Sequence, residues 1–319
     1  MRKTLLAALA LTMVVASCGD DDTAVTTAAT TTVAPTTTVD ATTTTVPAFP
    51  VTVAGVTIDE RPERIVSLSA THTEILFGVG AGDRVVATDL FSNFPAAAES
   101  TEKVDAFSLN VEAVAGLDPD LVILAFDPGD AVDGLGILGI PAVLFDAPAD
   151  LDGAFAQWID VARLTGNVTE AEALVADARR RVADVQDRLP QTLRAPTYYH
   201  ELDPSFFTVT SSTFFGAVYG AVGLENVADA ADESGFGYPQ LSPEYLVAAD
   251  PDYVFLADTK CCDVTPESFA DRPALGSLTA AVSDRVIAID DDIASRWGPR
   301  VVDFVELVAA AVHPEVFAG

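Results

Sequence analysis

Basic residues are scarce in this sequence of 319 residues, which has 17 lysine and arginine residues against 48 aspartate and glutamate residues. The formal net charge is −31 at pH 7. Proteins bind nucleic acids through clustered lysine and arginine side chains that neutralise phosphates, so this composition excludes a nucleic-acid partner. The acidity favours a solvated surface, kept soluble by charge repulsion, over a site for a cationic ligand.

Common catalytic motifs are also missing. The sequence contains no GxSxG, no HExxH, no P-loop and no cysteines at metal-ligand spacing. A hydrolase would need a nucleophile close to one of the three histidines, for instance Ser69 near His72 or Ser205 near His200. We expect that the protein is not an enzyme, and a surface hydrolase is the less favoured alternative.

Long apolar runs are missing as well. The run at residues 4–16 covers about 13 residues, whereas a membrane-spanning helix needs about 20. It follows Arg2-Lys3 and precedes small residues and Cys18, which is the layout of a secretory signal peptide over residues 1–17. The cysteine resembles that of a bacterial lipobox, in which Cys18 would be acylated. An ordinary signal peptide with a chance cysteine is the alternative.

Residues 18–48 consist almost entirely of Thr, Ala, Val, Asp and Pro, without a periodic apolar face. Such a segment buries too little surface to offset the entropy of ordering it. We expect a tether that holds a folded body on the extracytoplasmic face of the cell membrane through the lipid anchor. A disordered stub without a role is the alternative.

The remaining chain contains short apolar runs rich in Val and Ile, which are typical of strands buried on both faces of a parallel sheet. Helical patterns separate them, for example at residues 73–79 and 111–117. This alternation predicts an α/β fold. The expected strands are residues 64–68, 84–88, 121–126, 141–145, 197–200, 253–257 and 285–289.

One segment occurs twice. Residues 112–125 align without a gap to residues 244–257, sharing a glutamate, Asp-Pro-Asp and Val-x-Leu-Ala. Each copy follows a helix-capping residue, Asn110 or Ser242, so Glu112 and Glu244 are expected in the first turn of a helix. The repeat predicts two related lobes.

Residues 167–189 have apolar residues at helical spacing, with Thr169 as the expected cap and Pro190 as the stop, and predict a helix of about 20 residues. The fold class expected is therefore α/β, with two Rossmann-like lobes of parallel sheet joined by one long bridging helix that permits only slight rocking. The expected segments are a signal peptide (1–17), a tether (18–48), an N-terminal lobe (49–166), a bridging helix (167–190) and a C-terminal lobe (191–319).

Glycines form two noticeable groups. The segment 134–139 matches GxGxxG, but Pro141 begins the next apolar run almost at once. A dinucleotide-binding motif should instead open a helix directly after a strand, so we expect a turn here. Gly78, Gly80 and Gly82 are expected to terminate a helix.

Residues 50–319 resemble the helix-linked (class III) solute-binding proteins of ABC importers for ferric siderophores, haem and cobalamin. The resemblance rests on the order and spacing of several segments: 61–68 (RPERIVSL), 73–77 (TEILF), 80–86 (GAGDRVV), Phe94-Pro95 with Lys103-Val104, and Asn110-Val111-Glu112 leading to 117–122 (LDPDLV).

The resemblance implies an ABC permease dimer as partner. In that family one glutamate on each lobe projects toward arginines of the permease, and the matching positions here are Glu112 and Glu244. A carboxylate near a helix N-terminus also interacts favourably with the helix dipole, by about 0.3–1 kcal/mol. Both roles are compatible.

The ligand is expected between the lobes, at loops that follow the carboxyl ends of the strands. Aromatic walls suit large planar ligands, and arginine pairs well with anionic chelates. The candidate ligand-binding residues are Thr71, His72, Phe91, Asn93, Phe94, Phe107, Tyr199, His200, Phe236, Tyr238, Arg296 and Trp297.

The expected ligand is a small-molecule chelate, either a ferric siderophore or cobalamin, and no cofactor is predicted. The loop 92–95 resembles that of cobalamin binders, whereas Arg296 and Arg300 suit an anionic ferric chelate. A zinc- or manganese-binding importer lipoprotein is the alternative, because His72 and His200 follow predicted strands in opposite lobes. No HxH or HxxxH pair occurs, so no metal ligands are predicted.

Cys261 and Cys262 are adjacent and follow a predicted strand. An exported protein meets oxidising conditions that favour disulfides. A disulfide between the two neighbours, an intermolecular bond and free thiols near the cleft all remain open.

Overall fold

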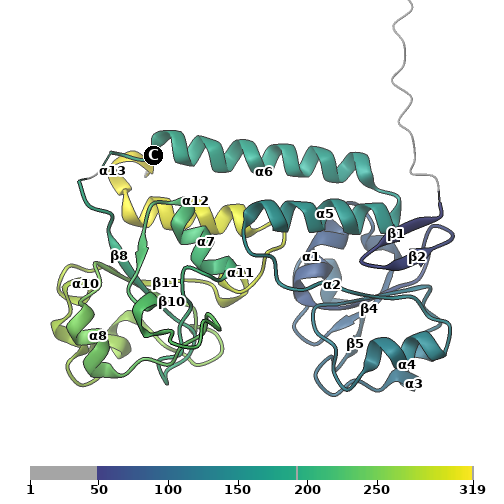
Figure 1. The fold of residues 1–319 in the computed structure, drawn as a ribbon, viewed down its shortest axis with the longest axis horizontal. Coiled ribbons are helices and arrows are strands. Elements are labelled where there is room, and N and C mark those ends of the chain that lie inside the picture. The colour runs from purple at the N-terminus through teal and green to yellow at the C-terminus, as the bar shows by residue number, and fades with distance from the viewer. Residues whose placement is uncertain (1–48, 192, 318–319) are drawn as a thin grey trace, which may run out of the picture. The chain divides into compact units, whose positions relative to one another are not determined.

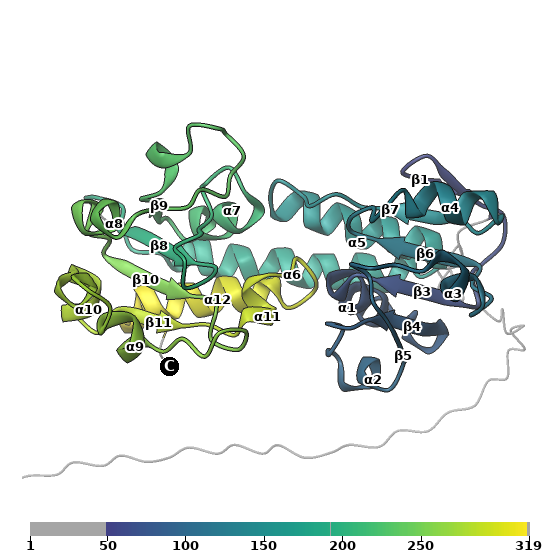
Figure 2. The same cartoon turned by 90° about the horizontal axis from the view of Figure 1, so that it is seen from below.

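The computed structural model describes residues 49–191 and 193–317, which belong to one compact unit (Figures 1 and 2). The predicted signal peptide, Cys18 and the predicted tether lie outside these residues. In the described part of the chain, no helix is long and apolar enough to cross a membrane.

The N-terminal lobe is built on a five-stranded parallel sheet. In spatial order its strands are β5 (Glu102–Val104), β4 (Val85–Asp89), β3 (Ile65–Leu68), β6 (Leu121–Leu124) and β7 (Ala142–Leu144). Four of them correspond to apolar runs predicted as strands. Strands β3 and β6 are buried along their whole length, as expected where both faces of a sheet are covered.

Short helices surround this sheet, and an antiparallel hairpin precedes it. The hairpin strands are β1 (Val51–Val53) and β2 (Val56–Ile58); the helices are α1 (Ala70–Gly78), η1 (Gly82–Arg84), α2 (Ala96–Glu99), α3 (Val111–Ala115) and α4 (Ala131–Ile137). Helices α1 and α3 confirm the helical patterns read from the sequence.

The C-terminal lobe has a four-stranded parallel sheet. Its strands, in spatial order, are β11 (Val286–Ala288), β10 (Tyr253–Leu256), β8 (Thr197–Glu201) and β9 (Glu225–Asn226). Three of these were expected. The helices are α7 (Phe214–Ala221), η2 (Asp229–Ala231), α8 (Pro243–Ala249), α9 (Pro266–Ala270), η3 (Leu275–Ser277), α10 (Thr279–Val282), α11 (Asp291–Ala294), α12 (Val301–Val312) and α13 (Pro314–Phe317).

Two consecutive helices connect the lobes: α5 (Leu151–Thr165) and the 21-residue α6 (Val168–Arg188). Helix α6 packs on α5 and also on α12 of the C-terminal lobe, as Figure 1 shows. The long helix was predicted, but Thr169 as its cap was wrong. Asn167 is the N-cap residue, and its side chain accepts a hydrogen bond from Arg84 instead of capping the helix (2.6 Å).

One hydrophobic cluster extends through both lobes. It includes Ile65 and Ile75 of the N-terminal lobe, Trp158 of α5, and Phe255 and Phe304 of the C-terminal lobe. The opposite face of each sheet has a separate cluster of its own. Because close-packed interiors transmit strain rather than deform freely, this shared core restricts movement of one lobe against the other.

The duplicated segment occupies equivalent places in the two lobes, with α3 leading to β6 and α8 leading to β10. The first aspartate of each Asp-Pro-Asp, Asp118 or Asp250, has a positive φ, of 51° or 43°. The second, Asp120 or Asp252, accepts a backbone hydrogen bond at the start of the neighbouring strand. The repeated residues therefore fix the same helix-to-strand turn twice.

Of the two predictions made for glycines, the helix end at Gly78 and Gly80 is confirmed, and the turn at residues 134–139 is wrong. Helix α1 ends at Gly78, and Gly80 follows with a φ of +80°. The expected turn at 134–139 is instead mostly helix α4, which ends at Ile137, and Gly139 with its φ of +75° follows it. This helix precedes β7 rather than following the phosphate-binding turn of a dinucleotide site.

Candidate functional site

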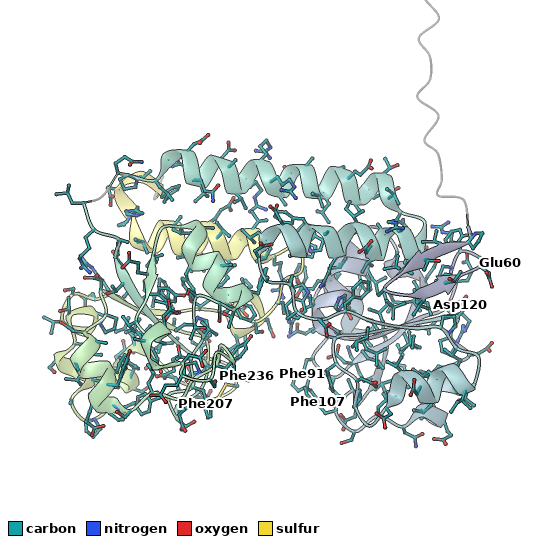
Figure 3. All side chains as sticks on the ribbon, viewed as in Figure 1. Glu60, Phe91, Phe107, Asp120, Phe207 and Phe236 are labelled. Carbon is teal, nitrogen blue, oxygen red and sulfur yellow. A yellow bond between two sulfur atoms is a disulfide. The ribbon has the colours of Figure 1, made fainter. Side chains whose placement is uncertain are left out.

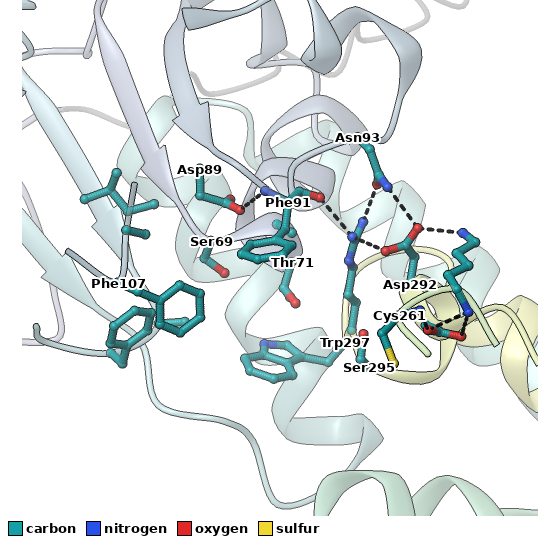
Figure 4. Close-up of a pocket in the computed structure, with 18 residues that line it drawn as sticks. Ser69, Thr71, Asp89, Phe91, Asn93, Phe107, Cys261, Asp292, Ser295 and Trp297 are labelled. Carbon is teal, nitrogen blue, oxygen red and sulfur yellow. Dashed lines mark hydrogen bonds and ion pairs between the residues drawn. The ribbon is translucent and has the colours of Figure 1, made fainter. Parts of the chain in front are cut away.

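A cavity of about 550 Å³ lies between the two lobes (Figure 4). Its lining combines loops that follow β3, β4, β5 and β6 with C-terminal-lobe residues after β10, at the start of α11 and just after α11. The lining residues are Leu68, Ser69, Ala70, Thr71, Asp89, Phe91, Asn93, Ala106, Phe107, Ala125, Phe126, Lys260, Cys261, Asp291, Asp292, Ser295, Arg296 and Trp297.

Three phenylalanines form the N-terminal-lobe wall of this cavity. The ring of Phe107 stacks on Phe126, with centroids 4.9 Å apart, and meets Phe91 edge-on at 5.9 Å. Their exposed fractions are 57% for Phe91, 67% for Phe107 and 37% for Phe126. In Figure 3, Phe91 and Phe107 lie on the edge of this lobe that is turned toward the other lobe. These rings offer an apolar surface that the protein leaves uncovered.

The loop after β4 holds Phe91 in place. The buried carboxylate of Asp89 accepts hydrogen bonds from the Phe91 N–H (2.7 Å) and the Ser92 hydroxyl (2.6 Å). The ammonium group of Lys103 donates to the Ser92 carbonyl (2.6 Å). The aromatic wall is thus preorganised rather than formed around a ligand.

The opposite wall contains the cysteine pair. Cys261 and Cys262 form a vicinal disulfide, and Cys261 lines the cavity. Of the three arrangements left open by the sequence, the structure has the bond between neighbours. Asp291 and Asp292, at the start of α11, lie on the same side of the cavity.

Both arginines proposed for an anionic chelate are engaged by Glu74 of α1. The Glu74 side chain is 1% exposed and binds Arg296 (2.9 Å) and Arg300 (2.5 Å). Gly298 lies between these arginines, where a Cβ atom would come within 3.0 Å of the Glu74 Cβ. Glycine therefore permits the close approach that both ion pairs require.

Arg296 has further partners on both lobes. It donates to the Asn93 side chain (2.9 Å), the Phe91 carbonyl (3.0 Å) and Asp292 (2.5 Å). Asn93 in turn donates to Asp292 (2.9 Å), as the dashed lines in Figure 4 show. Arg296 lines the cavity, but its guanidinium is committed to holding the lobes together.

Of the predicted ligand-binding residues, Thr71, Phe91, Asn93, Phe107, Arg296 and Trp297 line the cavity. The other six do not. His72, Tyr199 and His200 have no exposed surface, because their side chains point into the hydrophobic interior. Phe94 is partly exposed but stacks against Arg300, 4.2 Å from its ring centroid. Phe236 and Tyr238 pack against each other, with ring centroids 5.7 Å apart, and neither belongs to the lining.

The two buried histidines are structural. His72 stacks on Phe145 at 5.0 Å, and His200 Nδ1 lies 2.7 Å from the Tyr219 hydroxyl. Burial lowers the pKa of His72 to about 4, an effect that the nearby Gln157 side chain partly offsets. Burial likewise lowers the pKa of His200 to about 3. Both rings are therefore neutral at pH 7.

Several cavity residues were missed by sequence reasoning. Phe126 is the last residue of the expected strand 121–126, so a search that included the carboxyl ends of strands could have found it. Asp89 ends strand β4 and Ser69 follows β3 in the same way. Asp291 and Asp292 belong to an acidic run, which the abundance of acids elsewhere in the chain obscures.

The two repeat glutamates are exposed on the surface. Asn110 and Ser242 cap α3 and α8 as predicted, and Glu112 and Glu244 lie in the first turn of each helix. Figure 1 places α3 and α8 in different lobes, both on the side away from α6. Within residues 49–191 and 193–317, no three His, Cys, Asp or Glu side chains are grouped closely enough to hold a metal ion.

Comparison with known families adds an independent observation. Residues 65–293 match the model of a family described as periplasmic binding protein. This chain belongs to the periplasmic binding protein family. The class predicted from the sequence motifs is confirmed, and so is the two-lobed α/β architecture.

Curated relatives are similar to this chain over most of their length. A cobalamin-binding protein of Halobacterium salinarum is 33% identical, covering 83% of this chain and 75% of its own. An uncharacterised ABC transporter substrate-binding lipoprotein of Bacillus subtilis, YvrC, is 28% identical, with 84% and 87% covered.

Solved structures of family members show the same fold. The haem-binding protein RhuT of Roseiflexus sp. RS-1 superposes with a TM-score of 0.71 at 25% identity, covering 80% of this chain and 99% of its own. The vitamin B12-binding protein BtuF of Vibrio cholerae gives a TM-score of 0.67 at 26% identity, with 79% and 97% covered. These relatives are binding proteins rather than enzymes.

Glu74→Gln should lower the free energy of unfolding by about 3 kcal/mol, because it removes the buried charge that pairs with two arginines. Urea unfolding followed by circular dichroism measures this. Glu112→Gln is the control at an exposed position and should change stability by at most about 1 kcal/mol, the upper value of its interaction with the helix dipole. Equal effects of the two variants would contradict the role assigned to Glu74.

Protonation of the unfolded chain at His72 should contribute a loss of stability as pH falls from about 6.5 toward 4. The unfolded chain protonates His72 near its ordinary pKa of 6.5, whereas the folded protein holds that pKa at about 4. The unfolded state therefore binds more protons in this window. As a result, the free energy of unfolding decreases as the pH decreases.

His72→Gln cannot titrate and should lose about 2–3 kcal/mol less than wild type between pH 7 and pH 4.5. Urea unfolding at the two pH values tests this. His200 should sustain part of the pH dependence in the variant. An unchanged pH dependence in His72→Gln would show that this ring is not held neutral by burial.

Proposed function

We propose that this protein is a lipid-anchored substrate-binding protein that captures a corrinoid in the interlobe cavity and delivers it to an ABC importer. The observation that carries the choice of ligand is the combination of an uncovered phenylalanine wall with arginines already satisfied by Glu74. The similarity to the cobalamin-binding protein of Halobacterium salinarum supports the same choice.

A corrinoid presents a bulky apolar macrocycle edged by neutral amides. Phe91, Phe107 and Phe126 suit the macrocycle, since aromatic side chains supply large rigid contact surfaces. The carboxylates of Asp291 and Asp292 line the facing wall. Asp292 already accepts hydrogen bonds from Asn93, Lys260 and Arg296, but an ionised carboxylate has about four acceptor sites, so it can accept one more from an amide N–H group. Neutral amides also avoid the repulsion that these carboxylates would exert on an anion.

The same wall suits the other expected ligands less well. A ferric siderophore with anionic donors would be recognised best by free cationic groups. Lys260 in the cavity lining binds Asp290 (2.6 Å) and Asp292 (2.7 Å), so its charge is balanced. Haem iron commonly takes a His, Tyr, Met or Cys ligand. Among the described residues that line the cavity there is no His, Tyr or Met, and Cys261 is in a disulfide.

The proposed protein consists of a signal peptide (1–17), an acylated Cys18, a tether (18–48) and the two lobes joined over residues 167–190. The short apolar run before Cys18 and the Thr-rich composition that follows support this organisation. It would place the binding cavity outside the cytoplasmic membrane, within reach of a permease in the same membrane.

Docking to the permease dimer would use Glu112 and Glu244. Both carboxylates are exposed in equivalent first turns of α3 and α8. One acidic residue per lobe would meet one cationic site on each permease subunit, and charged rim residues of this kind guide association and orientation. The protein's action is binding, docking and release, without a chemical step.

Fluorescence titration of the purified chain with cyanocobalamin should give saturable quenching, after correction for absorbance by the ligand. Phe91→Ala combined with Phe107→Ala should weaken binding by about ten-fold or more, since each truncation removes a large apolar contact. Ile137→Ala, an equally apolar truncation in the same lobe but outside the cavity, is the control and should bind like wild type.

The same titration with haem, ferric siderophores, Zn²⁺ and Mn²⁺ decides between ligand classes. Tight binding of one of these together with no response to cyanocobalamin would overturn the corrinoid proposal. Binding of cyanocobalamin that is insensitive to Phe91→Ala with Phe107→Ala would overturn the assignment of the aromatic wall.

Glu112→Ala combined with Glu244→Ala should abolish corrinoid uptake by cells while leaving cyanocobalamin affinity unchanged. The control is Glu170→Ala with Glu172→Ala, which removes the same charge from exposed positions on α6. Uptake at the wild-type rate in the first variant would exclude docking through these glutamates. Loss of uptake in both variants would point to net charge rather than to these two positions.

A further inference from the structure

The vicinal disulfide lies at the rim of the proposed corrinoid cavity, on the loop that follows β10. Cys261 lines the cavity, and both cysteines are exposed. Figure 4 shows the Cys261 side chain near Ser295 and Trp297, on the wall opposite the phenylalanines. The proposed function, as argued from the aromatic wall and the repeat glutamates, does not use this bond.

The chain leading into the disulfide is firmly anchored. The carboxylate of Asp291 accepts hydrogen bonds from three consecutive backbone N–H groups, those of Thr259 (2.8 Å), Lys260 (3.0 Å) and Cys261 (2.9 Å). Lys260 also pairs with Asp290 and Asp292. These bonds therefore fix the backbone of residues 259–261 relative to α11.

The chain leaving the disulfide is held differently. Among the hydrogen bonds of the described residues, none involves Cys262, and Asp263 has a φ of +55°, which is uncommon for a residue other than glycine. The disulfide closes a small ring that contains the peptide bond between Cys261 and Cys262, and this ring restricts the backbone just after the part that Asp291 anchors. Without the bond, the backbone around residues 262 and 263 would sample more conformations.

An exposed disulfide is accessible to thiols, and exposed disulfides are typically the labile and regulatory ones. Reduction by a dithiol breaks the Sγ–Sγ bond, transfers two electrons and two protons to Cys261 and Cys262, and leaves the dithiol as a disulfide. Oxidation reverses the exchange. Apart from Cys18, which lies outside the described residues, the sequence holds no other cysteine.

We infer that the Cys261–Cys262 disulfide is a reversible redox site that shapes the rim of the ligand cavity. The inference rests on the proposed binding function. The oxidised ring presents a fixed wall to the ligand, whereas the reduced loop must be ordered when the ligand binds. Reduction therefore weakens binding by about two- to ten-fold, the range expected for ordering one or a few side chains.

The test uses the full chain carrying Cys18→Ser, so that Cys261 and Cys262 are the remaining thiols. Mass spectrometry first establishes the redox state, because the oxidised protein is lighter by two hydrogen atoms. Cyanocobalamin affinity is then measured for the oxidised protein and for the reduced protein after anaerobic removal of the dithiol, which keeps the reductant away from the ligand.

A second variant adds Cys261→Ser and Cys262→Ser. Its affinity should equal that of the reduced protein and should not respond to dithiol. Equal affinity in the oxidised, reduced and serine forms would overturn this inference while leaving the corrinoid proposal intact. Absence of cyanocobalamin binding in all forms would overturn the corrinoid proposal itself, and the inference with it.

Discussion

The buried carboxylate of Glu74 is the constraint on which the arrangement of the two lobes depends. It belongs to α1 of the N-terminal lobe and pairs with Arg296 and Arg300 of the C-terminal lobe. A buried charge is strongly unfavourable unless it is paired and hydrogen-bonded, so a shift of the lobes that breaks these pairs without admitting water would leave three charges unpaired. The hydrophobic cluster shared through α5 and α6 acts in the same direction.

This constraint determines what the cavity can recognise. Arg296 lines the cavity, yet its donors are directed to Glu74, Asn93, Asp292 and the Phe91 carbonyl. What remains for a ligand is an aromatic surface on one side and acidic and sulfur-containing groups on the other. Recognition by shape and by hydrogen bonds to neutral groups fits this wall better than recognition of an anion.

The sequence predicted the parts of the fold that local patterns determine. Buried parallel strands appear as apolar runs, and the repeat around Glu112 and Glu244 encodes one helix-to-strand turn twice. Thr169 was predicted as the cap of α6, whereas Asn167 occupies the N-cap position. The side chain of Asn167 is bound by Arg84, which is distant in the sequence. Such a contact leaves no local signal.

The site was predicted only in part for a similar reason. Position after a predicted strand correctly selected Thr71 and Phe91 as cavity residues, and Phe107 was selected by its place just before Asn110. Position after a strand also selected His72 and His200, because the sequence does not tell whether a side chain at a strand's end points to the cavity or into the core. The sequence also contained no sign that Arg296 and Arg300 pair with Glu74, because more than two hundred residues separate them from it.

A crystal structure of the chain with cyanocobalamin tests the central claim most directly. The account predicts the corrin ring against Phe91 and Phe107, amide contacts on the side of Asp291 and Asp292, and Arg296 and Arg300 still bound to Glu74. A ligand seated outside the interlobe cavity, or arginines released from Glu74 to contact it, would contradict the account.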